Sequence, residues 1–96
     1  MQFIHKERYL KRFDRFTRHE QLLIVEADRQ IRAYYTTRQA PHGLRIKLLC
    51  ASGQEKIFEA RATHSIRIVW AEQRDTVSFV LVGLHDEVKR FLRSLR

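Results

Sequence analysis

The spacing of the apolar residues changes once along this chain, near Gly43, and this change constrains the fold more than any other feature of the sequence. Before Gly43 the apolar residues recur three and four positions apart, which is typical of amphipathic helices. After Gly43 they alternate with polar residues, which is typical of strands that bury one face. The sequence therefore predicts an α+β fold with a helical half followed by a sheet.

The helical half is predicted to contain two antiparallel helices, over Lys6–Phe16 and His19–Thr37. Between them, Thr17 and Glu20 have the spacing of a capping box, in which the two side chains satisfy free amides at the start of the second helix. Met1–Ile4 is predicted to be a short edge strand. The two helices are expected to form a hairpin that packs on one face of the sheet.

The second half is predicted to contain four strands and a final helix. The strands are expected near Leu44–Leu48, Ile57–Ala62, Ile66–Ala71 and Thr76–Gly83, and the helix over Asp86–Arg96. Short connections between strands favour antiparallel neighbours. With the N-terminal segment, the prediction is a twisted antiparallel sheet of four to five strands.

The alternation also predicts which charged side chains leave the sheet on the face away from the helix hairpin. These are Arg45, Lys47, Glu59, Arg61 and Arg67, four cations and one carboxylate. A solvated outer face is the ordinary interpretation of such a pattern in an antiparallel sheet. The excess of Arg and Lys over Ser and Thr instead favours a surface that binds a polyanion.

Composition supports a small basic protein. The 96 residues fit one domain, residues 1–96, and 44% of them are hydrophobic, so a folded core is expected. The 19 Lys and Arg outnumber the 11 Asp and Glu, which gives a formal net charge of +8. This charge predicts attraction to nucleic acid or to an acidic partner protein.

Several classes of site are not supported by the sequence. Cys50 is the single cysteine, so no intrachain disulfide or cysteine-based zinc site is expected. The sequence has no His-Glu-x-x-His pattern and no glycine-rich phosphate loop, and no metal or cofactor is predicted. The longest uncharged stretch, Thr76–His85, is about half of the ~20 residues that a membrane-spanning helix needs. The protein is expected to be cytoplasmic, without a membrane partner.

Four blocks of the second half together resemble the RelE/ParE superfamily of toxins from type II toxin–antitoxin modules. They are Gly43–Leu48, Ile57–Ala62, Ile66–Trp70 and Leu81–Val88. The resemblance implies a two-helix hairpin on a twisted antiparallel sheet with a short C-terminal helix. It also implies a cognate antitoxin that wraps the toxin with an acidic or amphipathic segment, and contact with operator DNA only through that antitoxin.

The superfamily contains endoribonucleases that cut messenger RNA on the ribosome and poisons of DNA gyrase. For the nuclease branch, the resemblance implies that Arg67 lies at the scissile phosphate, that His85 acts as a general acid or base, and that Glu59 assists. Lys47, Arg61 and Arg45 are expected to bind RNA. The gyrase-poison branch usually lacks a histidine at the place of His85, so the ribosome-dependent nuclease is ranked first. A gyrase poison and an inactive member that only binds its antitoxin are the alternatives.

Each catalytic assignment also has a purely structural interpretation. Arg67 could pair with Glu59 or Glu72 across strands, and His85 could cap the start of the final helix. Trp70 is placed on the helix side by the alternation, away from any RNA. The remaining histidines are expected to be solvated: His5, His19, His42 and His64. The nuclease interpretation requires Arg67 and His85 to converge on one side of the molecule.

Overall fold

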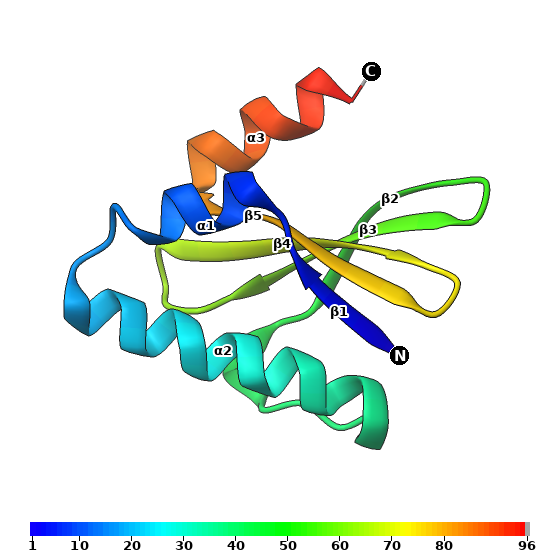
Figure 1. The fold of residues 1–96 in the computed structure, drawn as a ribbon, viewed down its shortest axis with the longest axis horizontal. Helices are drawn as coiled ribbons and strands as arrows, with labels where there is room; N and C mark the ends of the chain where they lie inside the picture. Colours follow the sequence, from blue (N-terminus) through cyan, green and yellow to red (C-terminus); the bar gives the residue numbers. More distant parts are fainter. Residues whose placement is uncertain (96) are drawn as a thin grey trace.

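We describe residues 1–95 in a computed structural model (Figure 1). A short strand and two helices precede a turn of 3-10 helix, four strands and a last helix. The elements are β1 (Gln2–His5), α1 (Glu7–Phe13), α2 (Arg18–Thr37), η1 (His42–Leu44), β2 (Lys47–Ser52), β3 (Glu55–Arg61), β4 (Ile66–Gln73), β5 (Thr76–Leu84) and α3 (His85–Ser94). The predicted α+β order is confirmed.

The five strands form one sheet in the order β1-β5-β4-β3-β2. Three neighbouring pairs, β2 with β3, β3 with β4 and β4 with β5, are antiparallel, as their short connections predict. The prediction of a wholly antiparallel sheet is wrong at one edge, because β1 runs parallel to β5. The two strands lie at opposite ends of the chain, so no hairpin turn fixes their direction.

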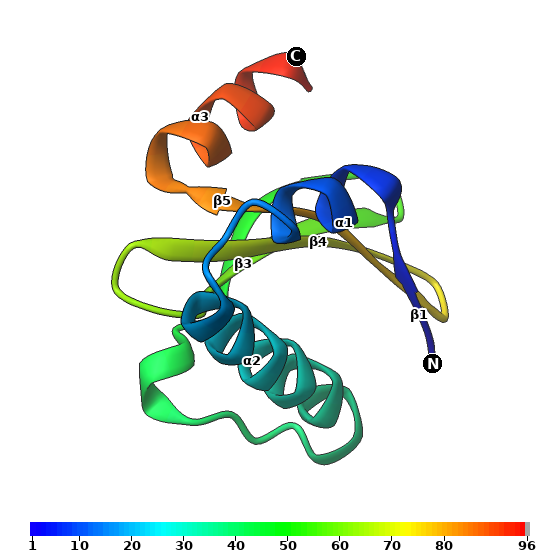
Figure 2. The same ribbon diagram turned by 60° about the vertical axis from the view of Figure 1, so that its left-hand side comes forward.

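The larger core lies between the sheet and α2. Figures 1 and 2 both show α2 on one side of the sheet and α3 on the other. Side chains of α2 and α1 meet inward-facing residues of the sheet, which are almost fully excluded from solvent. This cluster includes Tyr9, Ile24, Ala27, Ile31, Leu44, Ala60, Ile66, Ile68, Trp70, Val77, Phe79 and Val82. Trp70 is fully buried there, and its Nε1 donates to the Tyr35 hydroxyl at 2.7 Å.

The opposite face of the sheet is not open as predicted, because α3 covers part of it. Val88 of α3 packs with Ile57, Val69 and Leu81 of the sheet, and the partly buried Phe91 borders the same cluster. Apolar residues therefore occupy the middle of the face that was expected to be polar. Lys47, Glu59, Arg61 and Arg67 lie toward one end of this face, and Glu55 lies at the other end.

The start of α2 has the predicted capping box. The amide of Glu20 donates to the Thr17 hydroxyl at 3.2 Å, and the Glu20 carboxylate accepts from the Thr17 amide at 2.9 Å. These bonds lower the pKa of Glu20. The helix pair itself is confirmed, although α1 spans only Glu7–Phe13 where Lys6–Phe16 was predicted. None of the helices within residues 1–95 is long and apolar enough to cross a membrane.

The first predicted strand of the sheet half begins later than expected. Leu44 ends the 3-10 turn η1 and is buried in the core, and Arg45 follows in the left-handed region with φ 49°. The strand β2 begins at Lys47, and its register with β3 shifts between Leu48 and Cys50. Arg45 therefore leaves the chain from a turn and not from the strand, which corrects its predicted placement.

Candidate active site

The strand register gathers charged residues near one end of the sheet, where β3 and β5 end and β2 and β4 begin. Lys47 pairs with Glu59 between β2 and β3, and Arg61 pairs with Arg67 between β3 and β4. Gly83 of β5 lies opposite Arg67 on the other side. Directly paired residues and residues two apart on one strand share a face. The strand register thus places the predicted site residues of β2, β3 and β4 on the face of the sheet that α3 partly covers.

Arg67 and Glu59 form an ion pair within this group. Nη1 of Arg67 donates to Oε2 of Glu59 at 3.1 Å, and the two side chains are only 15% and 8% exposed. The pairing that was considered as a structural alternative is therefore present. It uses one donor of the guanidinium, and the Nε of Arg67 is buried without a hydrogen-bond partner among residues 1–95.

Arg67 and His85 line the same hollow. This hollow has a volume of about 330 Å³ and is lined by His64, Ser65, Arg67, Leu84, His85 and Asp86. It lies where the loop between β3 and β4 meets the junction of β5 with α3. The convergence of Arg67 and His85, which the nuclease interpretation requires, is therefore present.

His85 is the first residue of α3 and is exposed. It is not the group that caps the helix, because the carboxylate of Glu87 accepts from the amide of Leu84 at 3.1 Å. Predicting the start of α3 at Asp86 was one residue late. The imidazole of His85 therefore does not cap the helix, and it lines the hollow.

Gly83 allows α3 to begin close to the sheet. A Cβ atom at this position would lie 3.0 Å from Oε1 and 3.2 Å from Cβ of Glu87. Any larger residue would displace the first turn of α3 or the Glu87 carboxylate. The absence of a side chain at Gly83 thus helps to hold His85 beside the strand that carries Arg67.

The three predicted RNA-binding residues are not gathered at this hollow. Arg61 lies opposite Arg67 in the register but lines another hollow, with residues of α2 and with Pro41, Gly43 and Leu44. Lys47 is exposed at the start of the edge strand β2, and Arg45 is exposed in the preceding turn. Arg67 and His85 are therefore the two predicted residues that share a cavity, and Glu59 lies directly behind Arg67.

A second polar cluster was missed by the sequence prediction, which had His5 in solvent. His5 stacks on Phe79 with ring centroids 4.7 Å apart, and its Nε2 contacts Oδ2 of Asp28 at 2.6 Å. Asp28 also accepts from the Tyr9 hydroxyl at 3.1 Å and from Nε of Arg32 at 2.8 Å. Burial, and then the charge of Asp28, raises the pKa of Tyr9. This cluster joins β1, α1 and α2. The contacts of Asp28 with His5 and Tyr9 span 23 and 19 residues, so no local pattern indicates them, whereas Arg32 lies one helical turn from Asp28.

Among residues 1–95, no three His, Cys, Asp or Glu side chains gather closely enough to hold a metal ion. The groups available at the hollow are the guanidinium of Arg67, the imidazoles of His64 and His85, the hydroxyl of Ser65 and the carboxylate of Asp86. These groups can bind a phosphate and transfer a proton.

No family model and no curated protein matches this sequence. Solved structures do match it in fold. The archaeal RelE–RelB complex from Pyrococcus horikoshii superposes with a TM-score of 0.67 at 12% identity, over 86% of this chain and 92% of the other. The RelB–RelE antitoxin–toxin complex from Methanococcus jannaschii gives a TM-score of 0.64 at 14% identity, over 92% and 96% of the two chains.

A copper-bound mutant toxin from Helicobacter pylori also matches, with a TM-score of 0.66 and 14% identity over 92% of this chain and 98% of that one. All three chains are covered almost completely. The chain described here therefore has the RelE-like fold, as the four sequence blocks predicted.

Proposed function

We propose that this chain is the toxin of a type II toxin–antitoxin module and that it cuts messenger RNA on the ribosome. The fold supports the toxin class, and the hollow shared by Arg67 and His85 supports the nuclease branch. This shared hollow is the observation that carries the proposal, because a fold alone does not fix an activity.

The proposed reaction is attack of an RNA 2′-hydroxyl on the adjacent phosphorus. The hydroxyl loses its proton, the bond from phosphorus to the 5′-oxygen breaks, and that oxygen gains a proton, which leaves a cyclic phosphate. The phosphate carries extra negative charge in the transition state, and a fixed guanidinium stabilises it. Arg67 supplies this charge, and its Nε is a donor without a partner in the described chain. His85 transfers a proton at the mouth of the hollow.

Glu59 acts in this proposal by positioning Arg67. Its side chain is 8% exposed, and its carboxylate accepts from Nη1 of Arg67. It is absent from the lining of the hollow, so a direct role in proton transfer is not supported by its place. Lys47, Arg61 and Arg45 contact the RNA strand outside the hollow.

The proposed partners are a cognate antitoxin, the ribosome and its messenger RNA, with operator DNA bound only through the antitoxin. The edge strand β2 has no neighbour on its outer side within the described sheet, and Leu48 on it is 50% exposed. An extended segment of an antitoxin can add to such an edge by backbone pairing. The net charge of +8 favours an acidic segment.

The proposal is tested by inducing Arg67→Ala and His85→Ala separately in a bacterium without the antitoxin. Loss of either group is expected to lower the cleavage rate by on the order of 10²-fold or more and to relieve growth arrest. Arg18→Ala and His42→Ala are matched controls, because both residues are exposed and lie outside the hollow.

Circular dichroism and thermal melting check that each variant folds. Arg67→Gln, which keeps a hydrogen-bond donor beside Glu59 but removes the charge, serves as a second variant if Arg67→Ala is unstable. Full growth arrest by folded variants at both positions would remove the catalytic assignment. DNA damage signalling with translation initially intact would indicate a gyrase poison, and harmless wild-type protein would indicate an inactive member.

A further inference from the structure

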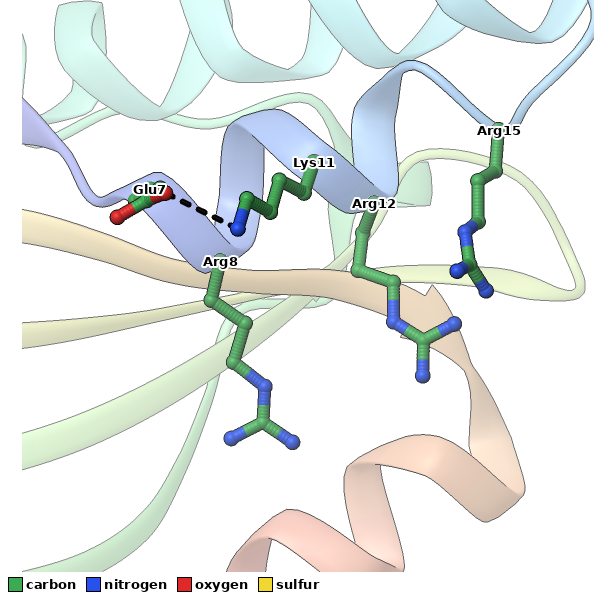
Figure 3. Close-up of a pocket in the computed structure, with 5 residues that line it drawn as sticks. All are labelled: Glu7, Arg8, Lys11, Arg12 and Arg15. Carbon is green, nitrogen blue, oxygen red and sulfur yellow. Dashed lines mark ion pairs between the residues drawn. The ribbon is translucent and has the colours of Figure 1, made fainter.

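A basic hollow lies along α1, outside the candidate active site. It has a volume of about 450 Å³ and is lined by Glu7, Arg8, Lys11, Arg12 and Arg15. Figure 3 shows Arg8, Arg12 and Arg15 extending from α1 and the turn after it toward the side on which α3 lies. Lys11 instead points back along the helix toward Glu7. We call this surface the α1 groove.

The acidic neighbours of the α1 groove neutralise only part of its charge. Nζ of Lys11 lies 3.0 Å from Glu7, and both side chains are highly exposed, at 74% and 80%. Arg12 pairs with Glu87 of α3 at 2.5 Å. Arg8 and Arg15 have no ion pair within residues 1–95, and the guanidinium of Arg8 lies 5.4 Å from the ring centroid of Phe91.

Folding alone does not account for this concentration of charge. The helix α1 has seven residues, and isolated helices shorter than about 12 residues are marginal in water. Arg8 is three residues from Lys11 and four from Arg12, and like charges at both spacings destabilise a helix. Three of the four cations are arginines, whose planar fork binds phosphate with two hydrogen bonds.

The α1 groove is connected to the candidate active site through the first turn of α3. The Glu87 carboxylate that pairs with Arg12 also accepts from the amide of Leu84. Leu84 and the next residue, His85, line the hollow that holds Arg67. His85, the proposed proton-transfer group, is therefore two residues from the Glu87 that pairs with Arg12, a rise of about 3 Å along the helix axis.

We propose that the α1 groove binds the phosphate backbone of the same single-stranded RNA that occupies the Arg67–His85 hollow. This inference rests on the proposed function for the identity of its ligand. Arg8 and Arg15 contact phosphates directly, and Arg12 is held by Glu87 between them. Binding in the groove sets the length of strand that the protein grips beyond the scissile linkage.

The test compares the double variant Arg8→Gln/Arg15→Gln with the control Arg18→Gln/Arg29→Gln, which removes the same charge from exposed positions on α2. Arg12 is retained, because its loss would leave Glu87, 17% exposed, without its ion pair. The probe is a fluorescent 12-nucleotide RNA, methylated at every 2′-oxygen so that it cannot be cut. Fluorescence anisotropy is recorded from 50 to 300 mM NaCl, and thermal melting verifies folding.

Loss of two phosphate contacts is expected to reduce the slope of log affinity against log salt by about 1.4, which corresponds to about 25-fold weaker binding at 0.1 M salt. The α2 control is expected to change affinity by less than about threefold, since it lowers the net charge by the same amount at positions outside the groove. A binding loss of the same size in both double variants would overturn the proposal. So would unchanged RNA binding together with weakened binding of poly-glutamate, which would assign the groove to an acidic protein segment.

A result that contradicts RNA binding in the α1 groove can be distinguished from a result that contradicts the proposed nuclease function. The methylated probe reports binding without cleavage, so its result does not depend on catalysis by Arg67 or His85. Variants at those two residues that remain toxic would contradict the nuclease proposal and leave the groove result standing. Normal RNA binding by Arg8→Gln/Arg15→Gln would contradict the proposal that the α1 groove binds RNA, and it would leave the nuclease proposal unaffected.

Discussion

The face of the sheet under α2 and the face under α3 differ in how completely they are covered. Under α2 the core is continuous, and Ile31, Ile68, Trp70 and Phe79 have no exposed surface. Under α3 the buried cluster is small and lies around Ile57, Val69, Leu81 and Val88. Arg67 and Glu59 lie near the start of α3, with the hollow that Arg67 shares with His85. Partial cover of this kind shields an ion pair while leaving room for a substrate.

The largest expected effect compares one isoleucine from each face. Ile68→Ala on the α2 side is expected to lower the free energy of unfolding by about 4 kcal/mol, and Ile57→Ala on the α3 side by about 2 kcal/mol. Ile68 is fully buried, whereas Ile57 is 5% exposed and borders the partly buried Leu49. A thinner layer can collapse around the lost methyl groups. Urea denaturation of both variants measures the difference, and equal costs would show that the two faces are equally well packed.

Substitution of Glu59 on the α3 side is expected to have a smaller effect on stability. Glu59→Ala is expected to lower stability by about 1–3 kcal/mol, because Arg67 is left largely buried without its partner. Glu59→Gln can still accept the hydrogen bond from Arg67, so cleavage is expected to stay within about tenfold of wild type. If Glu59 were the general base, the Gln variant would lose on the order of 10²-fold or more. Single-turnover cleavage rates of the two variants distinguish positioning from proton transfer.

The smallest expected effect concerns Tyr9 on the α2 side. The pKa of its hydroxyl is raised above the ordinary value of about 10, so the folded state holds this proton more tightly than the unfolded state. The contribution of the Tyr9 hydroxyl to the free energy of unfolding is fully present below pH 10. It falls as the pH rises further, by up to about 1.4 kcal/mol per pH unit.

Tyr9→Phe is expected to cost about 1 kcal/mol at pH 7, because the hydrogen bond to Asp28 is lost. Above pH 10 the variant should lose stability less steeply than wild type, with Tyr35, whose pKa is also raised, still contributing. Free energies of unfolding at pH 7 and from pH 9.5 to 11 measure this. Parallel alkaline curves for the two proteins would contradict the assigned role of Tyr9.

The α2 side was predictable from the sequence because its signals are local. Helical spacing in Ile24, Ala27 and Ile31 and the capping box at Thr17 each depend on neighbours within one or two turns. The alternation of Ile66, Ile68 and Trp70 likewise indicated the buried face of β4 correctly. These patterns reflect the residues that must be buried for the fold to form.

The α3 side was predicted less well. Val88, Phe91 and Leu92 have helical spacing, and Ile57, Val69 and Leu81 are apolar on the face expected to be polar. These two signals together would have predicted that α3 covers this face. Arg45 was misplaced because its left-handed backbone depends on how the chain leaves η1, which alternation does not encode. The meeting of Arg67 with His85 depends on strand register and on Gly83, and only the family resemblance indicated it.

The proposal that Arg67 and His85 cut messenger RNA is tested most directly by mapping RNA 5′ ends after induction without the antitoxin. Wild-type protein and His85→Ala, expressed at equal levels in folded form, are compared on and off ribosomes. The account predicts new ends within translated codons on ribosomes for wild type, and their loss in the variant. No new ends with wild-type protein, or the same ends with His85→Ala, would contradict it.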